Sequence, residues 1–256
     1  MLAIVLKKTA IEIWENAVLV FLGNVGVFGL MFVALVAALG LGASWGVTPM
    51  LVGFVLAAAV VAYVLIVSAD LLDMVCARAE FDREWLHARA RQAGGPAILF
   101  SATVLGLGAS LWMAASLAGR LSGIPLVIST LLFIWFVLFS VQTLLMLVPL
   151  IPQSEYRMIR ALRLSGLLVL GNPGYVLVIL IVVIVMTVLS VAVLPGPCGI
   201  LILLNNAVKL RLKRYEPDPA AAESPQGHTD WNRLLADERE RLANVRLRNL
   251  LFPWKW

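Results

Sequence analysis

Charged and metal-binding side chains are scarce in this sequence. Asp, Glu, Lys and Arg together make up only 14% of the 256 residues, and there are two histidines and two cysteines. Soluble domains carry about 25% charged residues, so this composition excludes a water-soluble enzyme. Two cysteines, Cys76 and Cys198, cannot form a disulfide framework. The chain contains no metal-binding, nucleotide-binding or hydrolase motif, so we expect no enzymatic activity, no cofactor and no metal ion.

Hydrophobic residues account for 61% of the chain and give it a mean hydropathy of +0.95. A helix needs about 20 apolar residues to cross a bilayer core of about 30 Å. The apolar runs, of which the last is short and less apolar, are residues 17–41, 49–69, 96–118, 121–151, 173–194 and 198–212. They predict an all-α, polytopic membrane protein whose membrane domain comprises residues 1–214.

The distribution of basic residues decides whether the run at 198–212 crosses the membrane, because cytoplasmic loops are enriched in Lys and Arg. With five crossings, nine bases lie on one side and only Arg120 on the other. Four bases lie at the end of the sixth run or directly after it, so a sixth crossing makes the ratio 13 to 1, whereas its absence makes it 9 to 5. We therefore expect six crossings of the cell (inner) membrane, with both termini in the cytoplasm. These bases flank apolar runs and form no soluble basic face for nucleic acid.

A repeated pattern predicts that the six crossings form three hairpins. Residues 7–26 and 155–174 align without a gap and share the ending Leu-Gly-Asn-x-Gly, and the connector before residue 96 fits the same frame less well. Each unit is predicted to contain a cytoplasmic amphipathic helix in the membrane interface, an elbow and a hairpin. Glycine permits a sharp turn, asparagine caps the next helix, and proline suits its first turn. The predicted elbow residues are Gly23, Asn24, Gly94, Gly95, Gly171, Asn172 and Pro173.

The segment after the membrane domain has a different composition. Residues 215–229 are rich in proline, alanine and acids and predict a flexible linker, and residues 230–256 predict a cytoplasmic amphipathic helix with a Trp-rich end. Indole rings favour the membrane interface, so we expect this helix to dock on the bilayer or on a partner protein. A solvated helix with an adhesive end is the alternative. The docking candidates are Trp231, Phe252, Trp254 and Trp256.

Polar groups at membrane depth are the candidates for a solute path, and they include the amides Gln142, Asn205 and Asn206. Such groups also form hydrogen bonds between helices, worth about 0.6 kcal/mol each in a membrane. For Asn205 and Asn206 both roles have equal weight, because two adjacent amides cannot both face one neighbouring helix. Asp70 and Asp73 are predicted to mark the point where the second run leaves the bilayer, with cation binding as the alternative.

Several segments carry a resemblance to a known family. The fourth run ends in Leu-Val-Pro-Leu-Ile-Pro at residues 147–152, a basic amphipathic stretch at 159–174 opens the fifth run, and a proline turn precedes the short helix at 195–206. In these features the chain resembles the YesL-like family of uncharacterised bacterial integral membrane proteins. The resemblance implies a cytoplasmic-membrane protein associated with sugar uptake, without assigned active-site residues.

Two functions are consistent with these patterns. The first is a non-enzymatic role in small-solute transport, with sugars as one class of solute and Gln142, Asn205 and Asn206 along the path. The second is a membrane scaffold or regulatory subunit whose C-terminal helix docks a cytoplasmic partner. The expected partners are accordingly the lipid bilayer and either a transporter or a cytoplasmic protein.

Six crossings place the connector around Arg160 and the segment around Arg211 on the same side of the membrane. Single cysteines introduced beside these two residues, in a variant that lacks Cys76 and Cys198, should both react with an impermeant thiol reagent only from the cytoplasmic face. Labelling in intact cells and in inverted vesicles measures this sidedness. Reaction of the two sites from opposite faces would show an odd number of crossings.

Overall fold

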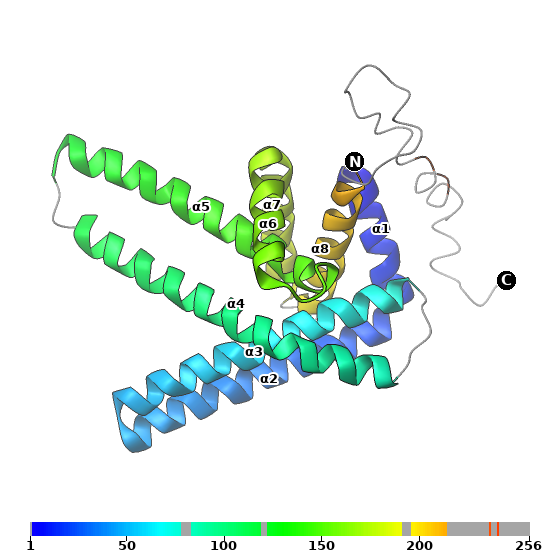
Figure 1. Ribbon diagram of the computed structural model, residues 1–256, viewed down its shortest axis with the longest axis horizontal. Helices are drawn as coiled ribbons and strands as arrows, with labels where there is room; N and C mark the ends of the chain where they lie inside the picture. Colours follow the sequence, from blue (N-terminus) through cyan, green and yellow to red (C-terminus); the bar gives the residue numbers. More distant parts are fainter. Residues whose placement is uncertain are drawn as a thin grey trace.

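The computed structural model describes residues 2–77, 83–118, 122–190 and 196–213, together with Ala236 and Glu240, and all regular secondary structure among them is helical (Figure 1). The all-helical class is therefore confirmed for the described part of the chain. The helices are α1 (Leu2–Glu15), α2 (Ala17–Trp45), α3 (Val47–Cys76), α4 (Arg83–Ala118), α5 (Ile124–Gln153), α6 (Met158–Gly171), α7 (Pro173–Leu189) and α8 (Gly196–Leu212).

Four of these helices are long and apolar enough to cross a membrane: Ala17–Gly40, Thr48–Cys76, Glu84–Leu117 and Ile124–Gln153. The pair α6 and α7 adds a fifth candidate if it is counted as one span, although its two helices meet at a bend of 104°. Helix α8, with 17 residues, is shorter than the about 20 residues of a typical crossing. Several long apolar helices thus indicate a multi-pass membrane protein.

The two long helix pairs differ in how closely they pack. A single residue, Gly46, joins α2 and α3, and Figure 1 shows these two helices side by side. By contrast, α4 and α5 stand apart towards their connected ends (Figure 1). There, Trp112 of α4 and Trp135 of α5 are 73% and 68% exposed. In a bilayer, where lipid tails are as apolar as these side chains, this exposure carries no penalty.

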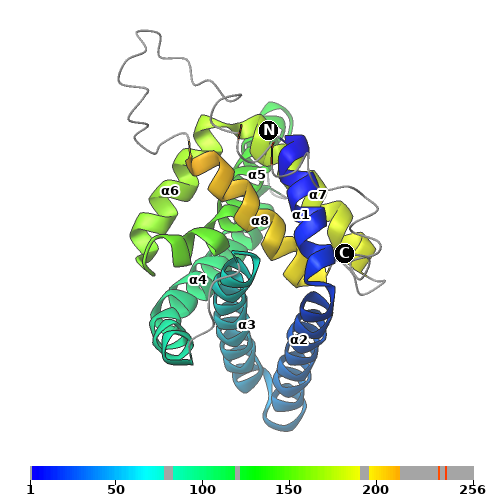
Figure 2. The ribbon, with the colours of Figure 1, turned by 90° about the vertical axis from the view of Figure 1, so that its right-hand side faces the viewer.

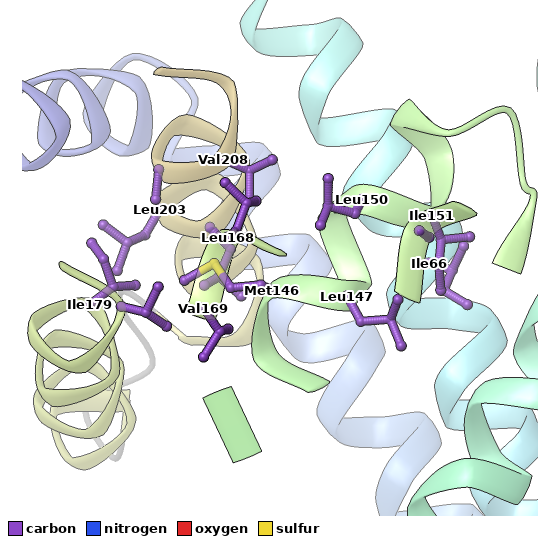
Figure 3. Close-up of a cluster of buried hydrophobic side chains, with 14 of the residues drawn as sticks. Ile66, Met146, Leu147, Leu150, Ile151, Leu168, Val169, Ile179, Leu203 and Val208 are labelled. Carbon is purple, nitrogen blue, oxygen red and sulfur yellow. The ribbon is translucent and has the colours of Figure 1, made fainter. Parts of the chain in front are cut away.

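Helix α8 is packed among five other helices. It contacts α1, α2, α3, α5 and α7, and Figure 2 shows it between α1 and α6. Twelve of its 17 residues are buried, which is the largest buried share among the helices. Leu203 and Val208 of α8 join Ile179 of α7 and Leu150 of α5 in the main hydrophobic cluster (Figure 3). The least apolar of the predicted crossings is therefore surrounded by protein, which explains how it tolerates two asparagines.

The beginning of α8 sits directly against α2. The Asn24 side chain is fully buried, and its Oδ1 accepts a hydrogen bond of 2.8 Å from the Cys198 backbone N–H. This bond satisfies one of the free N–H groups at the start of α8. Gly23 has no Cβ, and a Cβ there would lie 2.7 Å from the Cys198 Sγ. Gly196 has a φ of +56°, and a Cβ on it would overlap the Asn24 amide. Two glycines thus allow α2 and α8 to approach closely.

Two of the three predicted elbows are wrong. Helix α2 continues through Gly23 and Asn24, and its hydrogen-bond ladder joins that of α1, since the Val20 N–H donates to the Asn16 carbonyl at 2.9 Å. Helix α4 continues through Gly94 and Gly95, so no separate helix precedes α4. The physical reason is that glycine permits a bend without requiring one, so a helix can continue through these positions.

The third elbow position coincides with a sharp bend. The 104° change of direction between α6 and α7 falls at Asn172, which ends one helix and precedes the other, and Pro173 occupies the first turn of α7. The predicted capping by asparagine is wrong here, because the Asn172 side chain makes no capping hydrogen bond. The predicted linker at 215–229 lies outside the described residues, and so does all of the predicted tail at 230–256 except Ala236 and Glu240.

The close approach of α2 and α8 gives a second prediction. Gly196→Ala should lower the free energy of unfolding by about 1–3 kcal/mol, because the added methyl group overlaps Asn24 in a well-packed interface. Gly26→Ala is the matched control on α2, since no atom lies within 4 Å of the added Cβ. It should leave stability unchanged or raise it slightly. Thermal unfolding in mild detergent measures the stability of both variants. Equal stability of Gly196→Ala and Gly26→Ala would contradict the close packing of α8 against α2.

Candidate functional site

The main candidate site is a cavity of about 490 Å³ that is lined by five helices and open to the surface. Its volume lies within the range of about 300–1,000 Å³ that is typical of small-molecule pockets. The lining comes from α2 (Val27, Phe28, Met31), α3 (Leu65), α5 (Leu145, Val148), α7 (Thr187), the adjoining Ser190, and α8 (Pro197, Ile200, Leu201, Leu204). Helix α8 forms one wall of this space and contacts each of the other four helices that line it.

The cavity is almost entirely apolar. Its two hydroxyl groups already donate within their own helix: Thr187 to the Val183 carbonyl at 2.8 Å and Ser190 to the Met186 carbonyl at 2.7 Å. Phe28 and Met31 are 43% and 42% exposed, so the cavity reaches the outer surface along α2. In a bilayer that surface faces lipid tails. The site can therefore receive an apolar group by dispersion and shape, and it offers few polar partners.

The two asparagines predicted for the solute path lie elsewhere. Asn205 Nδ2 donates to the Ala69 carbonyl of α3 at 2.8 Å. Asn206 Nδ2 donates to Thr9 Oγ1 at 3.3 Å and to Glu12 Oε2 at 2.5 Å, both on α1. The adjacent amides thus face different neighbours, as their spacing requires. Both side chains are buried, and neither lines the cavity.

Gln142, the third residue predicted for the path, is buried in α5 and is likewise absent from the cavity wall. The structure therefore does not bring the three amides together in one site. The residues that form the cavity are ordinary hydrophobic ones, which sequence analysis cannot distinguish from other lipid-facing or core positions. Only their three-dimensional arrangement marks them.

The two acids near the end of α3 take separate partners. Asp73 Oδ1 lies 2.5 Å from Lys209 Nζ of α8. Asp70 Oδ2 accepts a hydrogen bond of 2.7 Å from the Tyr156 hydroxyl and lies 3.8 Å from Arg89 Nε of α4. Each carboxylate is thus engaged with a group on another segment. The pair fixes α3 to α8, to α4 and to the turn between α5 and α6.

Tyr156 and Arg89 form a polar cluster with Asp70 that sequence analysis did not predict. The Arg89 guanidinium lies 5.5 Å from the ring centroids of both Trp85 and Tyr156, a cation–π geometry on two sides. Burial, and then the hydrogen bond to Asp70, raises the pKa of Tyr156 well above its ordinary value. The phenol therefore stays protonated and remains a donor. The separation of 86 residues between Tyr156 and Asp70 leaves no local sequence signal for this contact.

The remaining predicted residues do not contribute to the cavity. Among the elbow residues, Gly23 and Asn24 receive the start of α8, and Gly94 and Gly95 lie inside α4. Gly171 ends α6 at the bend. The predicted docking residues fall outside the described part of the chain, namely Trp231, Phe252, Trp254 and Trp256.

Comparison with known proteins adds no functional assignment. No protein family, curated protein or solved structure matches the chain. The resemblance to YesL-like proteins stays a prediction, and the functional argument depends on the geometry of the cavity and its surroundings.

The hydrogen bond from Asn205 gives a third prediction. Asn205→Ala should lower the free energy of unfolding by about 0.6–1.7 kcal/mol, the range measured for interhelical hydrogen bonds in membranes. It should leave the binding of ligands in the cavity unchanged, because Asn205 does not line it. Unfolding and ligand titration of the same preparation measure both effects. A loss of solute flux at unchanged stability would instead place Asn205 on a solute path.

Proposed function

We propose that this protein is a non-enzymatic, multi-pass protein of the cell membrane that takes a small apolar or amphipathic solute from the bilayer into its central cavity for transport. The observation that carries the proposal is the cavity of about 490 Å³ with its apolar lining. A single-chain amphiphile such as a long-chain fatty acid has the matching chemistry. Burial of each methylene contributes about 0.8 kcal/mol, so the burial of about ten methylenes corresponds to micromolar binding.

The position of the cavity supports entry from the lipid phase. Phe28 and Met31 belong both to the cavity lining and to the exposed surface of α2. The next residue, Phe32, is 68% exposed and does not line the cavity. A solute dissolved in the acyl chains therefore meets the cavity without passing through water.

The polar groups favour this solute class over a sugar. Sugar binding requires hydrogen-bonding groups that point into the site, because buried hydroxyls without partners are costly. The Thr187 and Ser190 hydroxyls donate to backbone carbonyls, and the Asn205 and Asn206 amides donate to α3 and α1. We extend the proposal to six crossings with both termini in the cytoplasm, which is supported by the basic residues that flank the apolar runs.

Adjacent residues on α2 provide a sharp test of the cavity. Met31→Trp should fill part of the cavity and weaken the binding of radiolabelled palmitate to the purified full-length protein by roughly tenfold, which corresponds to the loss of about two buried methylenes. Phe32→Trp, which adds the same indole to the outward-facing side, is the control and should bind palmitate like the wild type.

Two results would overturn the proposal. The first is palmitate binding that Met31→Trp leaves unchanged, because the label then lies outside the cavity. The second is a wild type that does not bind palmitate but co-purifies with a cytoplasmic protein, if this co-purification is lost when residues 215–256 are removed. That outcome would favour the membrane scaffold.

A further inference from the structure

Helix α6 has one face that packs inside the protein. Ala161, Ser165, Leu168 and Val169 are buried, and the Ser165 hydroxyl donates to the Thr143 carbonyl of α5 at 2.6 Å. Helix α6 also meets α7 at 104°, so it runs nearly perpendicular to α7. If α7 follows the membrane normal, α6 lies in the plane of the membrane surface.

The opposite face of α6, here termed the α6 outer face, combines two kinds of exposed side chain. Three are large and apolar: Ile159, Leu167 and Leu170 are 85%, 54% and 68% exposed. The other two are Arg160 and Arg163, which are also exposed and form no ion pair with any residue in the described part of the chain. The outer face thus carries two positive charges beside an apolar surface, with no acid of its own.

Neither water nor the hydrocarbon core suits this combination. Exposed large apolar residues in a cluster are unfavourable in water. An arginine at the centre of a membrane helix is unfavourable, because its charge loses its hydration. The boundary between headgroups and acyl chains accommodates both, because the apolar side chains enter the lipid and the guanidinium groups reach the phosphates.

We infer that the α6 outer face is a binding site for the headgroups of acidic phospholipids on the cytoplasmic side of the membrane. Arg160 and Arg163 bind the lipid phosphates, since the planar guanidinium donates two parallel hydrogen bonds to a phosphate. Ile159, Leu167 and Leu170 contact the upper part of the acyl chains. The net positive charge of the face selects acidic over zwitterionic lipids, and the site is separate from the apolar cavity.

The test uses the full-length protein in a neutral detergent, with phosphatidylglycerol and phosphatidylcholine as probes and native mass spectrometry as the measurement. The wild type should bind phosphatidylglycerol in preference to phosphatidylcholine. Juxtamembrane arginines contribute about 1 kcal/mol each, so R160Q and R163Q should each weaken phosphatidylglycerol binding roughly fivefold, and the double variant roughly 25-fold. Thermal stability in the same detergent should stay unchanged, which separates lipid binding from folding.

Arg157 supplies the matched control. It is exposed and lies next to α6, but its Nε is 3.8 Å from Glu155 Oε2. R157Q removes the same formal charge as R163Q and should leave the affinity for phosphatidylglycerol within about twofold of the wild type, because Arg157 lies before the first residue of α6, outside the α6 outer face, and the adjacent Glu155 carboxylate offsets its charge. The variant R160K/R163K, which keeps the charge and loses the paired donors, should regain part of the affinity.

Three results would overturn the inference. An equal loss in R157Q and R163Q would show a general charge effect without a site on α6. Normal phosphatidylglycerol binding in R160Q/R163Q, with loss of inorganic phosphate binding, would show a site for free phosphate. Normal lipid binding with loss of a co-purifying protein would assign the face to a protein partner. None of these results depends on palmitate binding in the cavity, so the two proposals fail independently.

Discussion

A polar group buried among apolar side chains has no water to bind, and this constraint acts most strongly on α8, in which 12 of 17 residues are buried. Its two asparagines and the free N–H groups at its beginning each need a partner from the protein. Those partners come from three other helices: α2 supplies Asn24, α3 supplies the Ala69 carbonyl, and α1 supplies Thr9 and Glu12. These bonds hold α8 against α1, α2 and α3. The apolar cavity lies between α8 and the helices around it.

The sequence predicts the class of the protein and much of its segmentation, because length and apolarity determine which helices can span a bilayer. It does not predict where helices end inside an apolar run. Gly23 illustrates the reason: the same residue type permits a turn and permits close packing, and here it serves the second purpose against Cys198. At Asn172 the following proline removes a backbone donor and fixes φ, and the chain does bend there.

The candidate site was less accessible to sequence analysis than the fold. Polar residues are rare within the apolar runs, and Asn205 and Asn206 were therefore predicted to lie along a solute path. Their partners are 136 and 197 residues away in the chain, and no local pattern records such contacts. The cavity depends on Met31 and similar residues, whose identity is common throughout the membrane domain. What distinguishes them is their location, which only the packed structure provides.

The order of α8 in the chain has a consequence for biogenesis. Among the described helices, every one that contacts α8 precedes it in the sequence, so the ribosome completes all of these neighbours before α8 emerges. Until then, Asn24 and the carboxylate of Asp73 lack the partners that α8 brings. The packing of the earlier helices is therefore complete only after α8 has been synthesised and has bound to them. A nascent chain that stalls before residue 196 therefore lacks the two donors that α8 supplies, the Cys198 N–H for Asn24 and the Lys209 ammonium group for Asp73.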